Sequence, residues 1–136
     1  MNSIKRISVL TLLLIFLIGC KKTKEKNKLV GTWNVTEVSI SALIFTIPFT
    51  DTDSNPSGTI TFKAGGQGTQ NYTFKFLNDT VTQDDNFTWK IIKGELITGV
   101  DDKWERVINE NHLQKIKYTD SISATDIRTY TITMTK

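Results

Sequence analysis

The stretch TYTITMT at residues 129–135 decides the fold. Its large side chains, Tyr130, Ile132 and Met134, alternate with threonines, and this period of two places the two kinds of residue on opposite faces of an extended chain. β-Branched and aromatic residues also favour strands. The stretch therefore predicts a strand with one buried face and one face in water.

The same alternation recurs along most of the chain after residue 28, and turn residues interrupt it at short intervals. Tight links such as Lys93-Gly94 and Asn109-Glu110-Asn111 make consecutive strands antiparallel neighbours. The pattern predicts eight strands, at residues 31–40, 58–64, 69–77, 85–92, 95–100, 103–109, 112–119 and 126–135.

An even-numbered meander can close on itself, and closure removes the exposed edges that invite aggregation. We therefore expect residues 29–136 to form one domain, an all-β, eight-stranded antiparallel up-and-down barrel. A β-sandwich is the alternative, because the long link at residues 41–57 allows a crossing between sheets. Ten aromatic residues are expected to face inward: Trp33, Phe62, Tyr72, Phe74, Phe76, Phe87, Trp89, Trp104, Tyr118 and Tyr130.

The N-terminal region has a different character. An apolar run at residues 7–18 follows Lys5 and Arg6, is too short to span a bilayer as a helix, and ends in Leu17-Ile18-Gly19-Cys20. This pattern resembles a bacterial lipoprotein signal peptide, with residues 1–19 removed and Cys20 as the lipidated first residue. Residues 20–28 carry five lysines and one acid and predict a solvated tether. The alternative is an ordinary secretory signal with an incidental cysteine.

The resemblance implies a diacylglycerol on the Cys20 sulfur and an amide-linked chain such as palmitate, enough for stable membrane anchoring. Lys21 stands where enterobacterial lipoproteins retained in the inner membrane have an aspartate. The implied location is therefore the outer membrane. A periplasm-facing domain is favoured, and a surface-facing domain is the alternative.

The charge of the chain is divided between its parts. The whole sequence has a formal net charge of +3, but residues 29–136 hold ten Lys or Arg against thirteen Asp or Glu, a balance of −3. The domain thus has no basic face, and its composition argues against a nucleic-acid partner.

A family resemblance begins at Leu29-Val30-Gly31-Thr32-Trp33, which is similar to the Gly-x-Trp element of the first lipocalin strand. The segments ITFKAGGQG at 60–68, FTWKI at 87–91 and GEL at 94–96 continue the likeness to lipocalin-like domains of small envelope lipoproteins of the Bacteroidetes type. The resemblance implies that Trp33 plugs the closed end of the barrel beneath a cation from the last strand. Only Lys136 can supply that cation here, because Arg128 falls near the opposite end.

Strand parity places Glu37, Arg106 and Arg128 inside the barrel, where charges must pair, reach the mouth or meet a ligand. An arginine fork suits a carboxylate. Alternatively, all three lie near strand ends in solvent. The residues we expect to bind a small hydrophobic or amphiphilic ligand are Trp33, Phe45, Trp89, Trp104, Arg106 and Arg128. The many aromatic side chains leave open whether the interior is a cavity or a packed core.

The apolar stretch at residues 42–49 contains Pro48 and lies where lipocalins have the loop at the barrel mouth. It is either a lid over a ligand, a patch for a partner, or an extra packed strand or plug. The rival hypothesis for function is accordingly a pocketless interaction module that uses residues 43–49. Asp51, Asp53 and Asn55 have the spacing of calcium ligands, but Pro56 replaces the turn glycine, so we expect no metal. No catalytic triad or phosphate loop is apparent, and we expect neither catalysis nor a cofactor.

Overall fold

The computed structural model describes residues 26, 28–100 and 102–136. The predictions for the signal sequence, for the lipidation of Cys20 and for most of the tether lie outside the described residues. A helical turn that includes Lys26, Lys28 and Leu29 precedes the first strand. No helix in the described part of the chain is long and apolar enough to cross a membrane.

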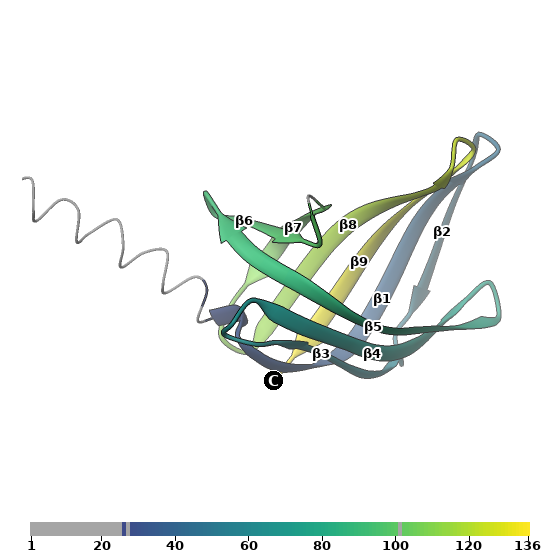
Figure 1. The fold of residues 1–136 in the computed structure, drawn as a ribbon. Coiled ribbons are helices and arrows are strands. Elements are labelled where there is room, and N and C mark those ends of the chain that lie inside the picture. Colours follow the sequence, from purple (N-terminus) through teal and green to yellow (C-terminus); the bar gives the residue numbers. More distant parts are fainter. Residues whose placement is uncertain (1–25, 27, 101) are drawn as a thin grey trace, which may run out of the picture.

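Nine strands follow in the described chain (Figure 1). They are β1 (Gly31–Ile44), β2 (Ile47–Asp53), β3 (Ser57–Phe62), β4 (Gln67–Phe76), β5 (Asp79–Ile92), β6 (Glu95–Thr98), β7 (Asp102–Asn109), β8 (Leu113–Ser123) and β9 (Asp126–Thr135).

The sheet closes into a barrel. From β3 onward, consecutive strands pair antiparallel with each other as far as β9. Strand β1 pairs with β3 on one side and, over most of its length, with β9 on the other. The closed circuit contains eight strands, because β2 lies outside it as an additional partner of β1. The predicted eight-stranded antiparallel barrel is confirmed, and a sandwich is excluded because one continuous ladder surrounds the core.

Strand β2 occupies part of the long link that the sequence left between the first two predicted strands. It pairs with residues 38–44 of β1, and β3 pairs with residues 31–34, so β2 and β3 follow one another along the same edge of β1. Pro48 is tolerated because β2 has a backbone partner on one side only. Of the alternatives for residues 42–49, the structure selects a paired strand.

The two acidic residues with calcium-like spacing have a structural role beside β4. The carboxylate of Asp53 accepts a hydrogen bond from the Lys75 backbone N–H at 2.7 Å, and that of Asp51 accepts one from the Leu77 N–H at 2.8 Å. These side chains satisfy backbone donors of β4 that no neighbouring strand reaches. In the described part of the chain, no group of three or more His, Cys, Asp or Glu side chains is arranged to hold a metal ion.

A β-bulge between Val35 and Glu37 changes the parity of β1. After the bulge Val38 and Ile40 face the core, and Glu37 lies on the outer face, where it accepts a hydrogen bond from the Thr133 hydroxyl at 3.3 Å and lies 3.9 Å from the Lys115 ammonium. The predicted inward position of Glu37 is therefore wrong, because an extra residue in one strand reverses every later side chain.

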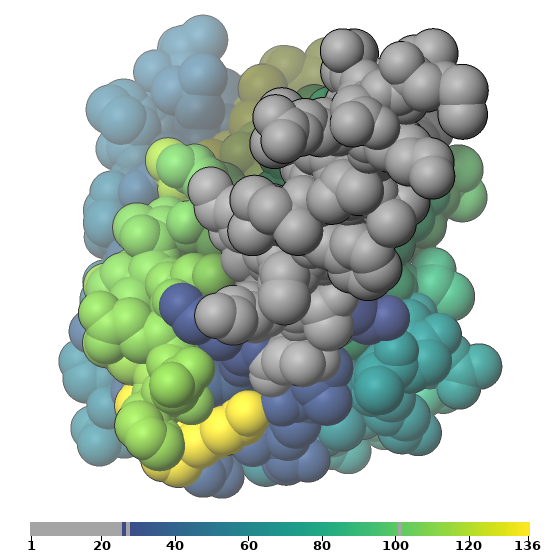
Figure 2. Space-filling model, turned by 90° about the vertical axis from the view of Figure 1, so that its left-hand side faces the viewer, coloured from purple at the N-terminus to yellow at the C-terminus, as the bar shows by residue number. Residues whose placement is uncertain are grey.

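The closed end of the barrel is built around Trp33, which has no exposed surface. Its indole N–H donates to the Leu29 carbonyl at 2.7 Å, and the Lys136 ammonium lies 4.2 Å from its ring centroid while donating to the Val30 carbonyl at 2.7 Å. Figure 2 shows the C-terminal residues against the first residues of the domain at this end. The expectation that Lys136 supplies the cation over Trp33 is confirmed.

The interior is rich in aromatic side chains, as predicted. All ten aromatic residues expected inside belong to the core or pack against it. Phe62 makes edge-to-face contacts with both Trp89 and Phe87, at centroid distances of 5.5 and 5.4 Å. The half of the barrel near Trp33 is therefore filled by side chains.

Candidate functional site

The wall of the barrel is incomplete on one side, away from the closed end. Residues 89–92 of β5 pair with β6, and residues 79–88 pair only with β4. On the other side of the gap, β7 reaches β8 only up to Lys117. Strands β6 and β7 are shorter than β5 and β8 (Figure 1). Residues 79–88 of β5 and residues 118–123 of β8 therefore face each other without a strand between them.

A cavity of about 370 Å³ lies at this interruption. Gln70, Gln83 and Phe87 line it from β4 and β5, and Tyr118, Thr119, Asp120 and Tyr130 line it from β8 and β9. The remaining lining comes from the β6–β7 hairpin: Thr98, Gly99, Asp102, Lys103 and Trp104. This volume falls within the range of small-molecule sites.

Aromatic rings form a continuous row along the cavity. Trp104 and Tyr118 stack at 4.8 Å between centroids and 13° between planes, and Tyr118 stacks on Tyr130 at 5.0 Å and 13°. Phe87 extends the row beyond Trp104 at 5.7 Å. Because these rings come from four different strands and hold each other in place, they form a rigid apolar surface on which a ligand can pack.

Polar groups without partners lie beside this row. The Gln70 amide oxygen and the Tyr72 hydroxyl are buried, and neither makes a hydrogen bond of normal geometry with a described residue. Burial raises the pKa of Tyr72 to about 12, partly offset by the nearby Tyr118 hydroxyl. Burial also raises the pKa of Tyr118, so both phenols keep their protons at neutral pH. Buried polar atoms without partners are rare in proteins. Those that do occur are often found at functional sites.

The charges that line the cavity are Lys103 and two carboxylates. The Lys103 ammonium lies 3.2 Å from the Glu95 carboxylate, so its charge is already matched. Asp102 and Asp120 line the cavity, and neither forms an ion pair with a described residue. The described lining is therefore acidic.

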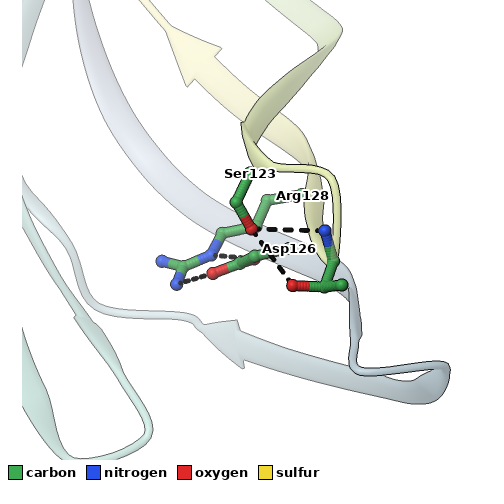
Figure 3. A network of polar contacts seen from close by, with 4 residues as sticks. Ser123, Asp126 and Arg128 are labelled. Atoms are coloured by element: carbon green, nitrogen blue, oxygen red, sulfur yellow. Dashed lines mark hydrogen bonds and ion pairs between the residues drawn. The ribbon is translucent and has the colours of Figure 1, made fainter.

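Arg128 lies near the mouth, and its guanidinium is held by the neighbouring turn. It donates to the Asp126 carboxylate through Nε at 2.9 Å and Nη2 at 2.7 Å, and it lies 5.3 Å from the centroid of the Phe76 ring. These hydrogen bonds lower the pKa of Asp126. Figure 3 shows this pair beside Ser123, whose hydroxyl accepts the Thr125 N–H in the same turn.

The structure distributes the six predicted ligand-binding residues over the molecule. Only Trp104 lines the cavity. Trp33 and Trp89 are buried toward the closed end, where the Trp89 indole N–H donates to the Gln67 carbonyl at 2.9 Å. Arg106 donates to the Gly94 carbonyl, and Phe45 is 72% exposed at the β1–β2 turn.

Sequence reasoning missed the polar lining, namely Gln70, Gln83, Asp102 and Asp120. Three of them had a detectable signal, because each shares a strand face with an aromatic residue: Gln70 lies two residues before Tyr72, Gln83 four residues before Phe87, and Asp120 two residues after Tyr118. Polar residues at inward positions of otherwise apolar strands mark places where the core gives way to a cavity.

Three other hollows lie on the surface. The one beside β6 and β7 has a volume of about 470 Å³ and includes Glu95, Lys103 and Glu105, whose side chains are exposed. The other two border the outer side of β4. The first also includes Trp104 and Arg106, two of the predicted residues, and one of the others includes Phe87. Of the four hollows, the 370 Å³ cavity is the one lined by Phe87, Trp104, Tyr118 and Tyr130 together, which makes it the better candidate.

The tips of two hairpins expose apolar side chains at the open end. Leu43, Phe45 and Ile47 come from the β1–β2 hairpin and Ile122 and Ile127 from the β8–β9 hairpin, and all are more than one-third exposed. The Phe45 N–H donates to the Thr125 carbonyl at 2.9 Å, which joins the two tips (Figure 1). We call these five residues the tip patch.

A closed antiparallel barrel with a plugged end and a cavity at its open half defines a calyx-like β-barrel, a class suited to small ligands. Comparison with known families gives the same assignment: the model of the lipocalin-like domain matches residues 29–136. The chain belongs to this family. No curated protein matches the sequence.

Proposed function

We propose that the protein is a lipid-anchored envelope protein that binds a small hydrophobic or amphiphilic molecule in its barrel and performs no catalysis. The single observation that supports binding is the 370 Å³ cavity, with its aromatic row and its unpartnered polar groups. The aromatic row provides an apolar contact surface, and the polar groups provide hydrogen bonds to one end of a ligand.

The absence of catalysis is part of this proposal. The titratable groups around the cavity are exposed carboxylates, a paired lysine and tyrosines, and burial raises the pKa values of Tyr72 and Tyr118. A tyrosine that keeps its proton at neutral pH is a poor general base. The lining therefore offers hydrogen bonds and packing rather than a nucleophile or a base.

Extraction of a ligand from the purified protein tests this function. We expect mass spectrometry of an organic extract to detect a small molecule in stoichiometric amount. The variant Trp104→Ala, which removes part of the aromatic row, should yield much less of it, and Leu77→Ala, a truncation at the exposed β4–β5 turn, should yield the same amount as the parent. An empty extract together with unchanged tryptophan fluorescence on titration with amphiphiles contradicts the proposal.

The anchor rests on the sequence ending in Cys20 and on the lysine-rich residues that follow it. We propose an outer-membrane location with the domain in the periplasm. Metabolic labelling with radioactive palmitate should mark the parent chain and leave Cys20→Ser unlabelled, and this variant should leave the membrane fraction. A variant that remains in the membrane fraction contradicts lipid anchoring.

A second candidate function is an interaction module without a ligand, and the tip patch favours it. Exposed apolar groups that lie together often mark contact sites for other proteins. Replacing Phe45 and Ile47 by serine should abolish capture of an envelope partner and leave ligand content unchanged. If it removes the ligand as well, the tip belongs to the ligand site.

A further inference from the structure

We infer that the ligand carries a cationic, N–H-rich head group, an ammonium, that is held between Asp120 and the tyrosines of the cavity. This inference rests on the proposed binding function and specifies the chemical class of the ligand. It reverses the sequence-based expectation of a carboxylated ligand, because that expectation depended on two arginines that the structure engages elsewhere.

The first step is the position of the cations. Arg106 does not line the cavity and donates to the Gly94 carbonyl. Arg128 is the cross-strand partner of Asp120, but its guanidinium donates two hydrogen bonds to Asp126 (Figure 3). Lys103 is paired with Glu95. Each cation beside the cavity in the described chain therefore has a protein partner of its own.

The second step is the surplus of negative charge. Asp102 and Asp120 line the cavity at its β6–β7 and β8 sides. Asp85 is the cross-strand partner of Gln70, and Asp120 lies two residues after Tyr118 in the same lining. A recess lined by charges of one sign concentrates ligands of the opposite sign.

The third step is independent of charge. Gln70 lines the cavity, and its buried amide oxygen has no hydrogen bond of normal geometry with a described residue; the Tyr72 hydroxyl, on a residue that is 1% exposed, lies near the Tyr118 hydroxyl of the lining. Both oxygens can accept hydrogen bonds. An ammonium donates up to three, whereas a carboxylate only accepts. The phenol O–H groups can donate to either head group, but the Gln70 oxygen and the aspartates favour the ammonium and repel a carboxylate.

The aromatic row adds a compatible surface. The rings stack on one another, so their edges offer apolar contacts to hydrocarbon, and the tyrosine hydroxyl oxygens can accept hydrogen bonds from a cationic head group. The Trp104–Tyr118–Tyr130 row therefore suits an amine with an apolar body, which packs along the rings while its head group reaches Asp120.

Three probes of equal chain length test the inference by titration calorimetry: n-decylammonium, n-decanol and n-decanoate. We expect decylammonium to bind at least tenfold more tightly than decanol, and decanoate to bind most weakly. Asp120→Asn should weaken decylammonium about tenfold or more, the scale of one charge-assisted hydrogen bond, and leave decanol unchanged.

Asp84→Asn is the matched control. Asp84 is also an exposed strand carboxylate, but it lies on the outer face of β5, where it accepts a hydrogen bond from the Asn71 side chain. Its loss removes the same charge without touching the cavity. Equal weakening by Asp84→Asn and Asp120→Asn would reveal a general charge effect and overturn the inference.

The remaining outcomes separate the inference from the proposed function. Decanoate that binds as tightly as decylammonium, or an Asp120→Asn variant with unchanged affinity for the amine, overturns the cationic head group and leaves ligand binding intact. Failure of all three probes to bind contradicts the inference of a cationic ligand and counts against the binding function as well.

Discussion

The two ends of this barrel use the same kinds of residues for different purposes. At the closed end, Trp33 is fully buried, its N–H has a backbone acceptor, and Lys136 covers its ring. At the open half, Trp104 stacks on Tyr118 beside buried oxygens that lack partners. Unsatisfied oxygens alone do not separate the two ends, because the buried Gln114 amide oxygen beside the end of β9 also lacks a partner among the described residues; the difference is the cavity next to those of the open half. The comparison teaches that the same residue types build a packed, closed end and an end that contains a cavity.

Removal of Trp33 should give the largest loss of stability. Trp33→Ala creates a large cavity in a packed region and should lower the free energy of unfolding by about 3–5 kcal/mol. Urea denaturation measures the change. Trp104→Ala is the counterpart at the open half, where the existing cavity already reduces packing, and it should have a clearly smaller effect. Equal losses in the two variants would break the contrast between the ends.

Alkaline pH should lower the free energy of unfolding through the buried tyrosines of the open half. Burial raises the pKa of Tyr72 from 10.0 to about 12, and in the unfolded chain the phenol returns to its ordinary value. The stabilising contribution is therefore complete below pH 10 and is lost as the pH rises from 10 towards 12, because only the unfolded chain releases the proton in that range. The expected loss is about 2–3 kcal/mol.

Urea denaturation at several pH values between 8 and 12 tests this titration. Tyr118 contributes in the same direction, since burial also raises its pKa. Tyr72→Phe should make the decline with pH shallower, and it should not lower stability at pH 8 because the hydroxyl it removes lacks a hydrogen bond of normal geometry. An unchanged decline in Tyr72→Phe would exclude this residue as the origin.

The cation over Trp33 should have a smaller effect. Lys136→Met removes one hydrogen bond to the Val30 carbonyl and the contact with the indole ring. Because Lys136 is exposed, we expect a loss of about 0.5–1.5 kcal/mol in urea denaturation. Lys136→Arg keeps the charge and should retain most of the stability. If Met and Arg variants are equally stable, the cation does not contribute.

The smallest effect is expected at the tip of the open end, and it is a gain. Thr46 has a φ of 70° in the two-residue β1–β2 turn, a conformation that is unfavourable for a β-branched residue. Thr46→Gly should therefore raise stability by about 0.5–1 kcal/mol. Thr50→Gly, in the extended part of β2, should lower it instead. A destabilised Thr46→Gly variant would show that the Thr46 side chain compensates for its backbone strain.

Much of the barrel could be predicted from residues alone, because alternation reports which face of a strand is buried. Strand β9 was predicted with its bounds correct to within one residue. Strands β5 and β8 are longer than predicted, since their upper inward positions carry Gln83, Asp85 and Asp120 rather than apolar residues. The prediction ended where the lining changes from core to cavity. Strand β2 was obscured by Pro48, which is acceptable only because that strand has one backbone partner.

The site was harder to predict than the fold. Trp104 was chosen for its size and inward parity and does line the cavity, but Trp33 and Trp89, chosen in the same way, lie toward the closed end. Parity gives the face of a strand and not the height along the barrel axis. The bulge at Glu37 and the pairing of Arg128 with Asp126 also depend on neighbours that the sequence does not identify.

By itself, the sequence determined the period of two, the antiparallel order of the strands and the cation available for Trp33, because these follow from the local alternation of residues and from short turns. Only the tertiary structure decided which strands are too short to complete the wall, which rings stack into one row and which charges have partners. These properties depend on register and on contacts between residues far apart in the chain, and they are what separates the filled end from the end with a cavity.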